Sequence, residues 1–294
     1  MNTEQQNPRT LQLDQLSSLD AVQLMHQEDM QVMHAIQEAL PQIARAVDAI
    51  VKQLKLGGRL IYLGAGTSGR LGVLDAVECV PTFGVSSDLV QGILAGGMNA
   101  MFFSSEGAED DPDLAVEDLQ TIHFNAPDIL VGIAASGRTP YVLGALAYAK
   151  RLGVPSIGIA CNQPSAVLDQ ADIAIPILTG AEVLTGSTRL KAGTAQKMVL
   201  NMLSTLSMVQ MGKVYGNLMV DVSVSNSKLM ARGKRIISEL TGASEAQAEQ
   251  ALQEANQQVK TAIVMLKRGV DAASARRLLQ EADGYVRRVI EAPE

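Results

Sequence analysis

Apolar residues recur along the chain with two different periods, and these periods divide it into three parts. Over residues 11–55 the apolar positions follow helical spacing, which predicts a helical lead-in. Between residues 57 and 180, short apolar runs alternate with helix-like segments. From about residue 235 the sequence becomes rich in Ala, Gln and Glu and predicts three helices. Five apolar runs are expected to be strands: 59–64, 89–94, 129–134, 155–160 and 172–177.

The alternation of strands and helices predicts the α/β class, with a doubly wound parallel sheet of five strands. We expect an N-terminal helical lead-in over residues 1–55, the sheet domain over residues 56–220 and a C-terminal helical domain over residues 221–294. Ligands of such sheets bind beyond the carboxyl ends of the strands. A functional site is therefore expected in the loops that follow the strands.

The tripeptide Ser-Gly-Arg occurs twice, at residues 68–70 and 136–138, and each copy directly follows an expected strand. A hydroxyl-rich cluster at residues 186–194 opens another helix-like segment, of which Thr194 is the expected N-cap. Helix N-termini offer unpaired N–H groups and partial positive charge, and Gly allows the backbone to approach a ligand closely. The three segments together predict a pocket for an anion such as phosphate.

Net charge limits how that anion can be held. The 294-residue chain carries a formal charge of −7 and has no basic block, which argues against a nucleic-acid partner. Because the chain as a whole repels anions, local dipoles and a few cations, such as Arg70, Arg138 and Lys191, are needed to hold the phosphate. No apolar run approaches the length of a membrane span, and the first thirty residues do not resemble a signal sequence. We expect a cytoplasmic protein whose two cysteines, Cys79 and Cys161, stay reduced.

The first loop, residues 64–69, also fits the G-x-G-x-x-G pattern of dinucleotide-binding proteins. Such proteins place an Asp or Glu at the end of the second strand to hold the ribose, whereas residues 93–97 here are Ile-Leu-Ala-Gly-Gly. The dinucleotide interpretation also leaves the second Ser-Gly-Arg tripeptide unexplained. Glycines that serve only tight turns are a further alternative.

Carboxylates are better candidates for proton transfer than the three histidines, which lie in the lead-in and in one loop. Glu78 follows the first loop in apolar company, where burial is expected to raise its pKa and suit it to act as a general acid. Glu109 belongs to an acidic cluster, residues 106–111, that could supply a base. A solvated acidic loop is the alternative for this cluster. Glu182 is a further candidate with the same ambiguity.

Five motifs occur in order along the chain: GAGTSGRLG at 64–72, EGAED at 106–110, GIAASGRTPY at 132–141, TGSTRLKAGTAQK at 185–197 and GNLMVD at 216–221. Together they resemble the N-acetylmuramic acid 6-phosphate etherases, which belong to the sugar isomerase domain (SIS) family. The resemblance runs through nearly the whole chain. It implies a flavodoxin-like sheet that binds a sugar phosphate, a homodimer, and a C-terminal domain similar to ubiquitin-associated folds.

The resemblance implies a lyase of cell-wall recycling that needs no metal or cofactor. It would cleave the D-lactyl ether of N-acetylmuramic acid 6-phosphate, giving N-acetylglucosamine 6-phosphate and D-lactate. In the open-chain sugar a base removes the C2 proton, an acid protonates the departing ether oxygen, and water then adds. By the family's motifs Glu78 is the proton donor and Glu109 the base, although the residues alone do not order the two roles.

The same resemblance implies that the sugar phosphate lies across all three loops. A non-catalytic sugar-phosphate regulator, similar to the glucokinase regulatory protein, and an aldose–ketose isomerase are the alternatives. A regulator does not need an acid–base pair, whereas an isomerase needs only a base beside C2. The binding residues implied are Gly66, Thr67, Ser68 and Gly69 in the first loop, Ser136, Gly137, Arg138 and Thr139 in the second, and Ser187, Thr188 and Lys191 in the third.

Overall fold

The computed structural model describes residues 2–103, 107–224 and 226–291. It divides the chain into two compact units. The first unit comprises Met1–Ala76 and Asp88–Ser204, and the second comprises Val77–Ser87 and Thr205–Glu294. Within the described ranges, no helix has the length and apolar character needed to cross a membrane.

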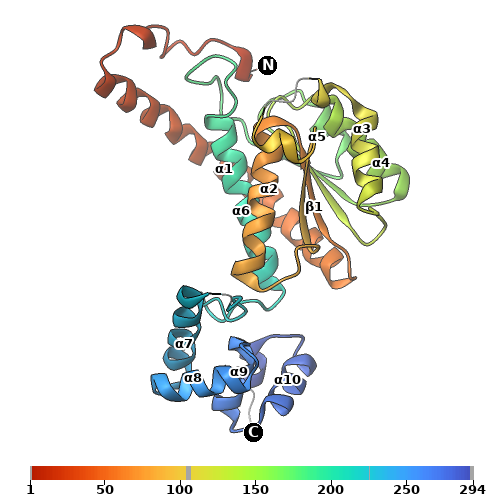
Figure 1. Cartoon of the computed structure of the whole chain (residues 1–294). Helices are drawn as coiled ribbons and strands as arrows, with labels where there is room; N and C mark the ends of the chain where they lie inside the picture. Colours follow the sequence, from red (N-terminus) through yellow and green to blue (C-terminus); the bar gives the residue numbers. More distant parts are fainter. Residues whose placement is uncertain (1, 104–106, 225, 292–294) are drawn as a thin grey trace. The chain divides into compact units, whose positions relative to one another are not determined.

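A five-stranded parallel sheet forms the centre of the first unit (Figure 1). The strand order is β2-β1-β3-β4-β5, which is the flavodoxin-like order. This confirms the doubly wound sheet, and each strand ends within one residue of its expected bounds. The strands are β1 (Leu60–Gly64), β2 (Val90–Leu94), β3 (Ile129–Ile133), β4 (Ser156–Ala160) and β5 (Ile173–Pro176).

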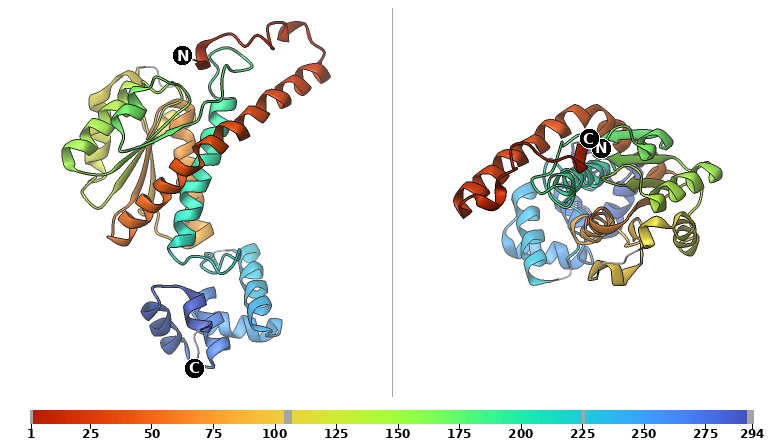
Figure 2. Two further views of the ribbon diagram at one scale, coloured as in Figure 1. Left: turned by 180° about the vertical axis from the view of Figure 1, so that it is seen from behind. Right: turned by 90° about the horizontal axis from the view of Figure 1, so that it is seen from above.

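Helices cover both faces of the sheet because successive strand residues point to opposite faces and both sets are apolar. Ile61 and Leu63 pack into one core with residues of α3, α4 and α5. Tyr62 points to the other face, where it meets Gly72 of α2. Figure 2 shows α1, α2 and α6 on that second face. The helices that begin in this unit are α1 (Ser18–Lys55), α2 (Gly66–Phe83), α3 (Pro112–Thr121), α4 (Pro140–Leu152), α5 (Ala166–Gln170) and α6 (Lys191–Gln210).

The predicted apolar stripe of the lead-in is buried along only part of α1. Val32, Ile36 and Ile43 are buried, as are the apolar residues that follow on the same face. Leu19 and Val22, nearer the start of the helix, are 67% and 64% exposed in the single chain. The first turns of α1 therefore present apolar side chains that this chain itself does not cover.

Among the described residues, five helices lie wholly within the second unit, where the sequence predicted three. Ser244 and Asp271 cap helices at the predicted places, Ser244 within a capping box. The first helix is capped by Asn226, earlier than expected, and the last is a short helix after Gly284. The helices are α7 (Ser227–Thr241), α8 (Glu245–Glu254), α9 (Val259–Arg268), α10 (Ala272–Glu281) and α11 (Val286–Ile290).

A buried lysine ties these helices to the segment that follows α6. Lys260 of α9 donates to Asp221 Oδ2 at 2.6 Å and to the carbonyl oxygen of Gly212 at 3.1 Å. Burial lowers the pKa of Lys260, while the charge and hydrogen bond of Asp221 act in the opposite direction. Asp221 ends the 216–221 motif, so this motif has a structural role within the second unit.

Candidate functional site

A cavity of about 560 Å³ lies beyond the carboxyl ends of β1 and β3. Its walls are residues 65–68 after β1, residues 133–136 and 138–140 at and after the end of β3, and Thr188 in the loop before α6. Glu109 and Asp110 form an acidic side of the same cavity. The strand ends thus hold a site where the parallel sheet predicts one.

The loop after β1 turns directly into α2, which begins at Gly66. Gly69 packs so closely on the end of β1 that an added Cβ would overlap the carbonyl oxygen of Gly64. The first residues of α2, with the half-buried Thr67, line the cavity, so the unpaired N–H groups of this helix end lie at its wall. Ser68 is buried, and its hydroxyl donates to Gln196 Oε1 at 3.0 Å.

The second loop, after β3, also depends on a glycine. Gly137 has a φ of 73°, and an added Cβ would overlap the side chain of Ser165. The hydroxyls of Ser136 and Thr139 lie 3.4 Å apart at the cavity wall, just before α4. Among the described residues that line the cavity, only Arg138 is positively charged. This loop offers hydroxyl groups, a helix N-terminus and a guanidinium group to an anion.

The third loop contributes one of its two predicted hydroxyl residues to the cavity. Thr188 lines it, whereas the neighbouring Ser187 does not. The carbonyl oxygen of Thr188 accepts from the N–H of Gly193 at 2.9 Å, so the loop is joined to the first turn of α6. An added Cβ on Gly193 would contact Thr67, so the first turn of α6 approaches the first loop closely.

Lys191, which the sequence predicted at the phosphate, lies away from the cavity lining. Its ammonium group is 2.9 Å from Glu28 Oε2 of α1, and its side chain is only 2% exposed. A cation that is buried, paired with a carboxylate and outside the cavity lining is not placed to bind the ligand. The structure therefore assigns Lys191 to the internal packing of the first unit.

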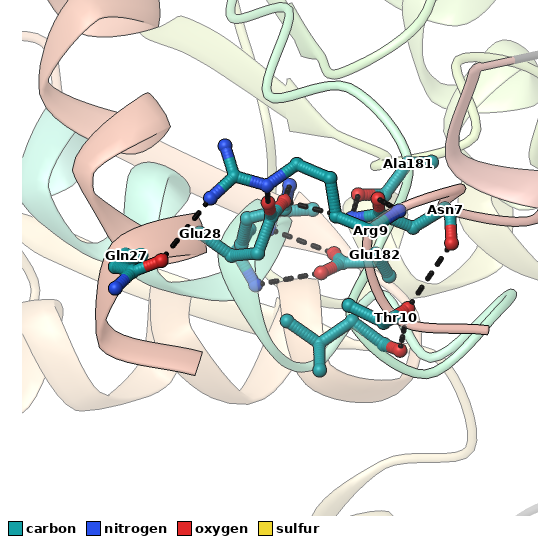
Figure 3. Close-up of polar contacts among 10 residues, drawn as sticks. Asn7, Arg9, Thr10, Gln27, Glu28, Ala181 and Glu182 are labelled. Atoms are coloured by element: carbon teal, nitrogen blue, oxygen red, sulfur yellow. Dashed lines mark hydrogen bonds and ion pairs between the residues drawn. The ribbon is translucent and has the colours of Figure 1, made fainter. Parts of the chain in front are cut away.

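Glu182, considered as a base, caps α6 (Figure 3). Its two carboxylate oxygens accept from the N–H groups of Lys191 at 2.9 Å and Ala192 at 3.0 Å. Burial raises the pKa of Glu182, and these hydrogen bonds and the Lys191 charge partly offset that effect. The expectation that Thr194 caps this helix is wrong, because Thr194 lies inside α6 and its hydroxyl donates to Leu190.

The acidic residues 106–111 have two different roles, since some line the cavity and one caps a helix. Glu109 lies in a 3-10 turn, Ala108–Asp110, with its side chain exposed at the cavity. Asp111 caps α3 by accepting from the N–H groups of Asp113 and Leu114. Glu106 lies outside the described residues. Of the described members, Glu109 and Asp110 are therefore placed to meet a ligand.

Glu78 lies on α2, eleven residues after Thr67, which corresponds to about 16 Å along a helix. The predicted apolar surroundings are not found, because its side chain is exposed in the single chain, as are those of Leu74 and Val77. The cavity lining includes Glu109 but not Glu78.

Two residues next to the site carry no prediction from the sequence. Gln196 bonds to Ser68, and Asn162 donates to the carbonyl oxygen of Ala135 in the second loop at 3.0 Å. Asn162 comes two residues after the end of β4. A search for polar residues after every strand, rather than for repeated motifs alone, would have found it.

Comparisons with known proteins agree with this architecture. Family models match for the SIS domain at residues 111–206, the glucokinase regulatory protein N-terminal SIS domain at residues 42–150, and the C-terminal lid domain of glucokinase regulatory protein at residues 216–262. A phosphoheptose isomerase from Francisella tularensis has the same fold, with a TM-score of 0.52 and 18% identity, over 66% of this chain and all of its own.

Sequence relatives cover almost the entire chain. An N-acetylmuramic acid 6-phosphate etherase from Serratia proteamaculans is 55% identical over 97% of this chain and 96% of its own. A second, from Vibrio cholerae, is 54% identical over 99% of this chain and 95% of its own. With more than half of the aligned positions identical over nearly its full length, the chain belongs to the N-acetylmuramic acid 6-phosphate etherase family.

Proposed function

We propose that the protein cleaves the D-lactyl ether of N-acetylmuramic acid 6-phosphate and releases N-acetylglucosamine 6-phosphate and D-lactate. The observation that carries the proposal is the cavity at the ends of β1 and β3, which combines anion-binding loops with the carboxylate of Glu109. A sugar phosphate requires the loops, and removal of a C2 proton requires the carboxylate. Membership of the etherase family supports this choice of substrate.

The phosphate would bind to hydroxyls and helix N-termini rather than to a cluster of cations. Thr67 and Ser68 on the first loop, and Ser136 and Thr139 on the second, surround the cavity with Thr188 of the third. The N-termini of α2 and α4 add unpaired N–H groups and a favourable dipole. Arg138 would supply the balancing positive charge.

The reaction would be an elimination followed by a hydration. Glu109 takes the C2 proton, which is acidified by the C1 aldehyde of the open-chain sugar. The C3–O bond breaks, its electrons leave with the lactyl oxygen, and a proton from the general acid converts that oxygen to the hydroxyl of D-lactate. Water then adds across the C2–C3 double bond and restores a C3 hydroxyl group.

We propose Glu78 as that general acid, delivered by a second copy of the chain. Its distance of about 16 Å from Thr67 along α2 exceeds the length of a hexose phosphate. The exposed apolar side chains of α1, including Leu19, Val22 and Met33, support a homodimer, since a second copy would cover them. A cytoplasmic location is proposed with it, supported by the buried thiols Cys79 and Cys161.

The decisive experiment measures D-lactate release from N-acetylmuramic acid 6-phosphate with a coupled D-lactate dehydrogenase. We expect Glu109→Gln to lower kcat by about 10²–10⁴-fold while the product N-acetylglucosamine 6-phosphate still binds. Asp110→Asn, a neighbouring change in the same cavity, is the matched control and should keep most of the rate. Binding of the sugar phosphate without lactate release from the unchanged protein would favour the regulator instead.

Mixing two inactive variants tests the origin of Glu78. A heterodimer of Glu78→Gln and Glu109→Gln subunits contains one intact site if the partner's Glu78 completes each site, and activity then returns on mixing. If both glutamates of a site come from one chain, the heterodimer has no intact site and the mixture stays inactive.

A further inference from the structure

The segment Thr3–Thr10, here called the N-terminal clasp, is bonded to two of the three loops that form the cavity. Thr3 is completely buried, although it lies close to the chain terminus. Asn7 and Thr10 are also buried, at 6% and 8% exposure. Buried polar side chains are held in place by specific hydrogen-bond partners.

Thr3 is joined to the second loop through Asn162. The N–H of Thr3 donates to Asn162 Oδ1 at 3.1 Å, and Asn162 Nδ2 donates to the Thr3 hydroxyl at 2.7 Å. The same Nδ2 donates to the carbonyl oxygen of Ala135 at 3.0 Å. Ala135 lines the cavity immediately before Ser136. One buried amide side chain therefore ties the clasp to the loop after β3.

Thr3 is joined to the third loop through its own backbone. Its carbonyl oxygen accepts from the N–H of Gly186 at 3.2 Å, and Gly186 in turn accepts from the N–H of Thr188 at 3.0 Å. Thr3 is thus a bridge between the two loops that present Ser136 and Thr188 to the cavity. Between β5 and α6 the chain forms no helix or strand, so contacts with other segments set the position of this loop.

The rest of the clasp holds the same loop further upstream (Figure 3). The Thr10 hydroxyl donates to the carbonyl oxygen of Val183 at 2.9 Å. Asn7 Nδ2 donates to Glu28 Oε2 at 2.7 Å and to the carbonyl oxygen of Ala181 at 3.4 Å. These contacts hold residues 181 and 183 of the third loop against the N-terminal clasp. Glu182, between them, joins the same loop to the start of α6.

We infer that the N-terminal clasp positions the phosphate-binding loops, with Thr3 and Asn162 as the positioning residues. The inference rests on the proposed function for the identity of the ligand. Neither residue touches the sugar phosphate. Losing their bonds leaves the sheet intact but lets the second and third loops separate, which weakens ground-state binding rather than the chemical step.

The test compares Thr3→Val, Thr3→Ser and Asn162→Ala with Ser17→Ala, which removes an exposed capping hydroxyl at the start of α1. We expect KM for D-lactate release and Kd for N-acetylglucosamine 6-phosphate to rise about tenfold in Thr3→Val and Asn162→Ala, with kcat within about twofold of the original. Thr3→Ser, which keeps the hydroxyl, should restore both constants, and Ser17→Ala should not change them. An unchanged KM and Kd, or a fall in kcat alone, would overturn the inference.

Hydrogen exchange separates this inference from the proposed function, because it needs neither ligand nor turnover. In Asn162→Ala, which removes the bonds to Ala135 and to Thr3, the amides of residues 134–139 and 181–190 should both exchange faster, while those of β1 and β3 stay protected. Exchange rates equal to those of the unchanged protein would refute the clasp even if the enzyme is active. A lack of lactate release would refute the etherase activity without affecting the exchange result.

Discussion

The Glu28 carboxylate lies 2.9 Å from the Lys191 ammonium group, and both side chains are almost completely buried. Glu28 also accepts from Asn7 and pairs with Arg9 at 3.0 Å, so its charge is matched by several donors. Desolvating two ions is unfavourable, and such a pair is tolerated only when further hydrogen bonds satisfy its atoms. Because Glu28 is on α1 and Lys191 begins α6, the pair fixes these helices relative to each other within the first unit.

Removing one member of this pair should destabilise the protein strongly. We expect Lys191→Met to lower the free energy of unfolding by about 3 kcal/mol or more, because Glu28 then keeps a buried charge with fewer partners. Urea denaturation followed by circular dichroism measures the loss. Lys150→Met, at an exposed position of α4, is the control and should stay within about 0.5 kcal/mol. Equal losses in the two variants would contradict the role of the pair.

The same carboxylate makes stability depend on pH. Burial alone would raise the pKa of Glu28, but hydrogen bonds from Lys191 and Asn7 and the nearby positive charges lower it below 4.5. A lowered folded-state pKa means that the carboxylate stabilises the fold above pH 4.5 and that this contribution is lost as pH falls through the folded value.

The difference in unfolding free energy between the original protein and Glu28→Gln should therefore be constant near neutral pH and shrink in acid. Denaturation at a series of pH values from about 3 to 7 measures this difference. A difference that does not change over this range would show that Glu28 has no shifted pKa.

Gly137 is expected to tolerate no side chain. Gly137→Ala combines a φ of 73° with overlap on Ser165, whereas Gly153, with a φ of 68°, has open space for a Cβ. Gly153→Ala should cost about 1 kcal/mol from backbone strain alone. Gly137→Ala should cost more and should also raise KM, because the loop must move. Thermal denaturation and D-lactate release measure the two effects, and identical behaviour of the two variants would contradict the steric argument.

Arg138 should contribute to phosphate binding, because it lies between Ser136 and Thr139 in the second loop. We expect Arg138→Gln to weaken the binding of substrate and of product equally, by roughly 10- to 100-fold, since both molecules carry the phosphate. Arg189→Gln, an exposed change next to Thr188 but outside the cavity lining, is the control. Calorimetry with N-acetylglucosamine 6-phosphate and KM for the substrate give the comparison. A loss confined to the substrate would assign Arg138 to the lactyl carboxylate instead.

The sheet could be predicted closely because its strands are buried on both faces. Such strands appear in sequence as short continuous apolar runs, as in 129–134 and 155–160. The start of α6 could not be found in the same way, because its cap comes from Glu182, nine residues before the first helical N–H that it binds. The usual preference for a hydroxyl residue as N-cap selects Thr194. In the structure, the Glu182 carboxylate of the preceding loop already accepts from the first N–H groups of α6.

The site was predictable where a motif follows a strand, as at Thr67 and Ser136, and not where contacts join distant segments. Lys191 pairs with Glu28 across 163 positions, and Thr3 meets Asn162 across 159. No periodicity or spacing reports such contacts. The exposure of Glu78 was missed for a related reason, since Leu74, on the same face one turn earlier, is itself exposed in the single chain and does not bury the carboxylate.

The second compact unit is assembled from two separate stretches, Val77–Ser87 and Thr205–Glu294. The chain passes from one unit to the other after residues 76, 87 and 204. A gene fragment that begins at residue 205 would therefore encode this unit without one of its parts. Recombination that replaces it with the counterpart from a relative has to exchange two distant stretches of coding sequence at once. We therefore expect the two units to be inherited together and to diverge together in descendants of this gene.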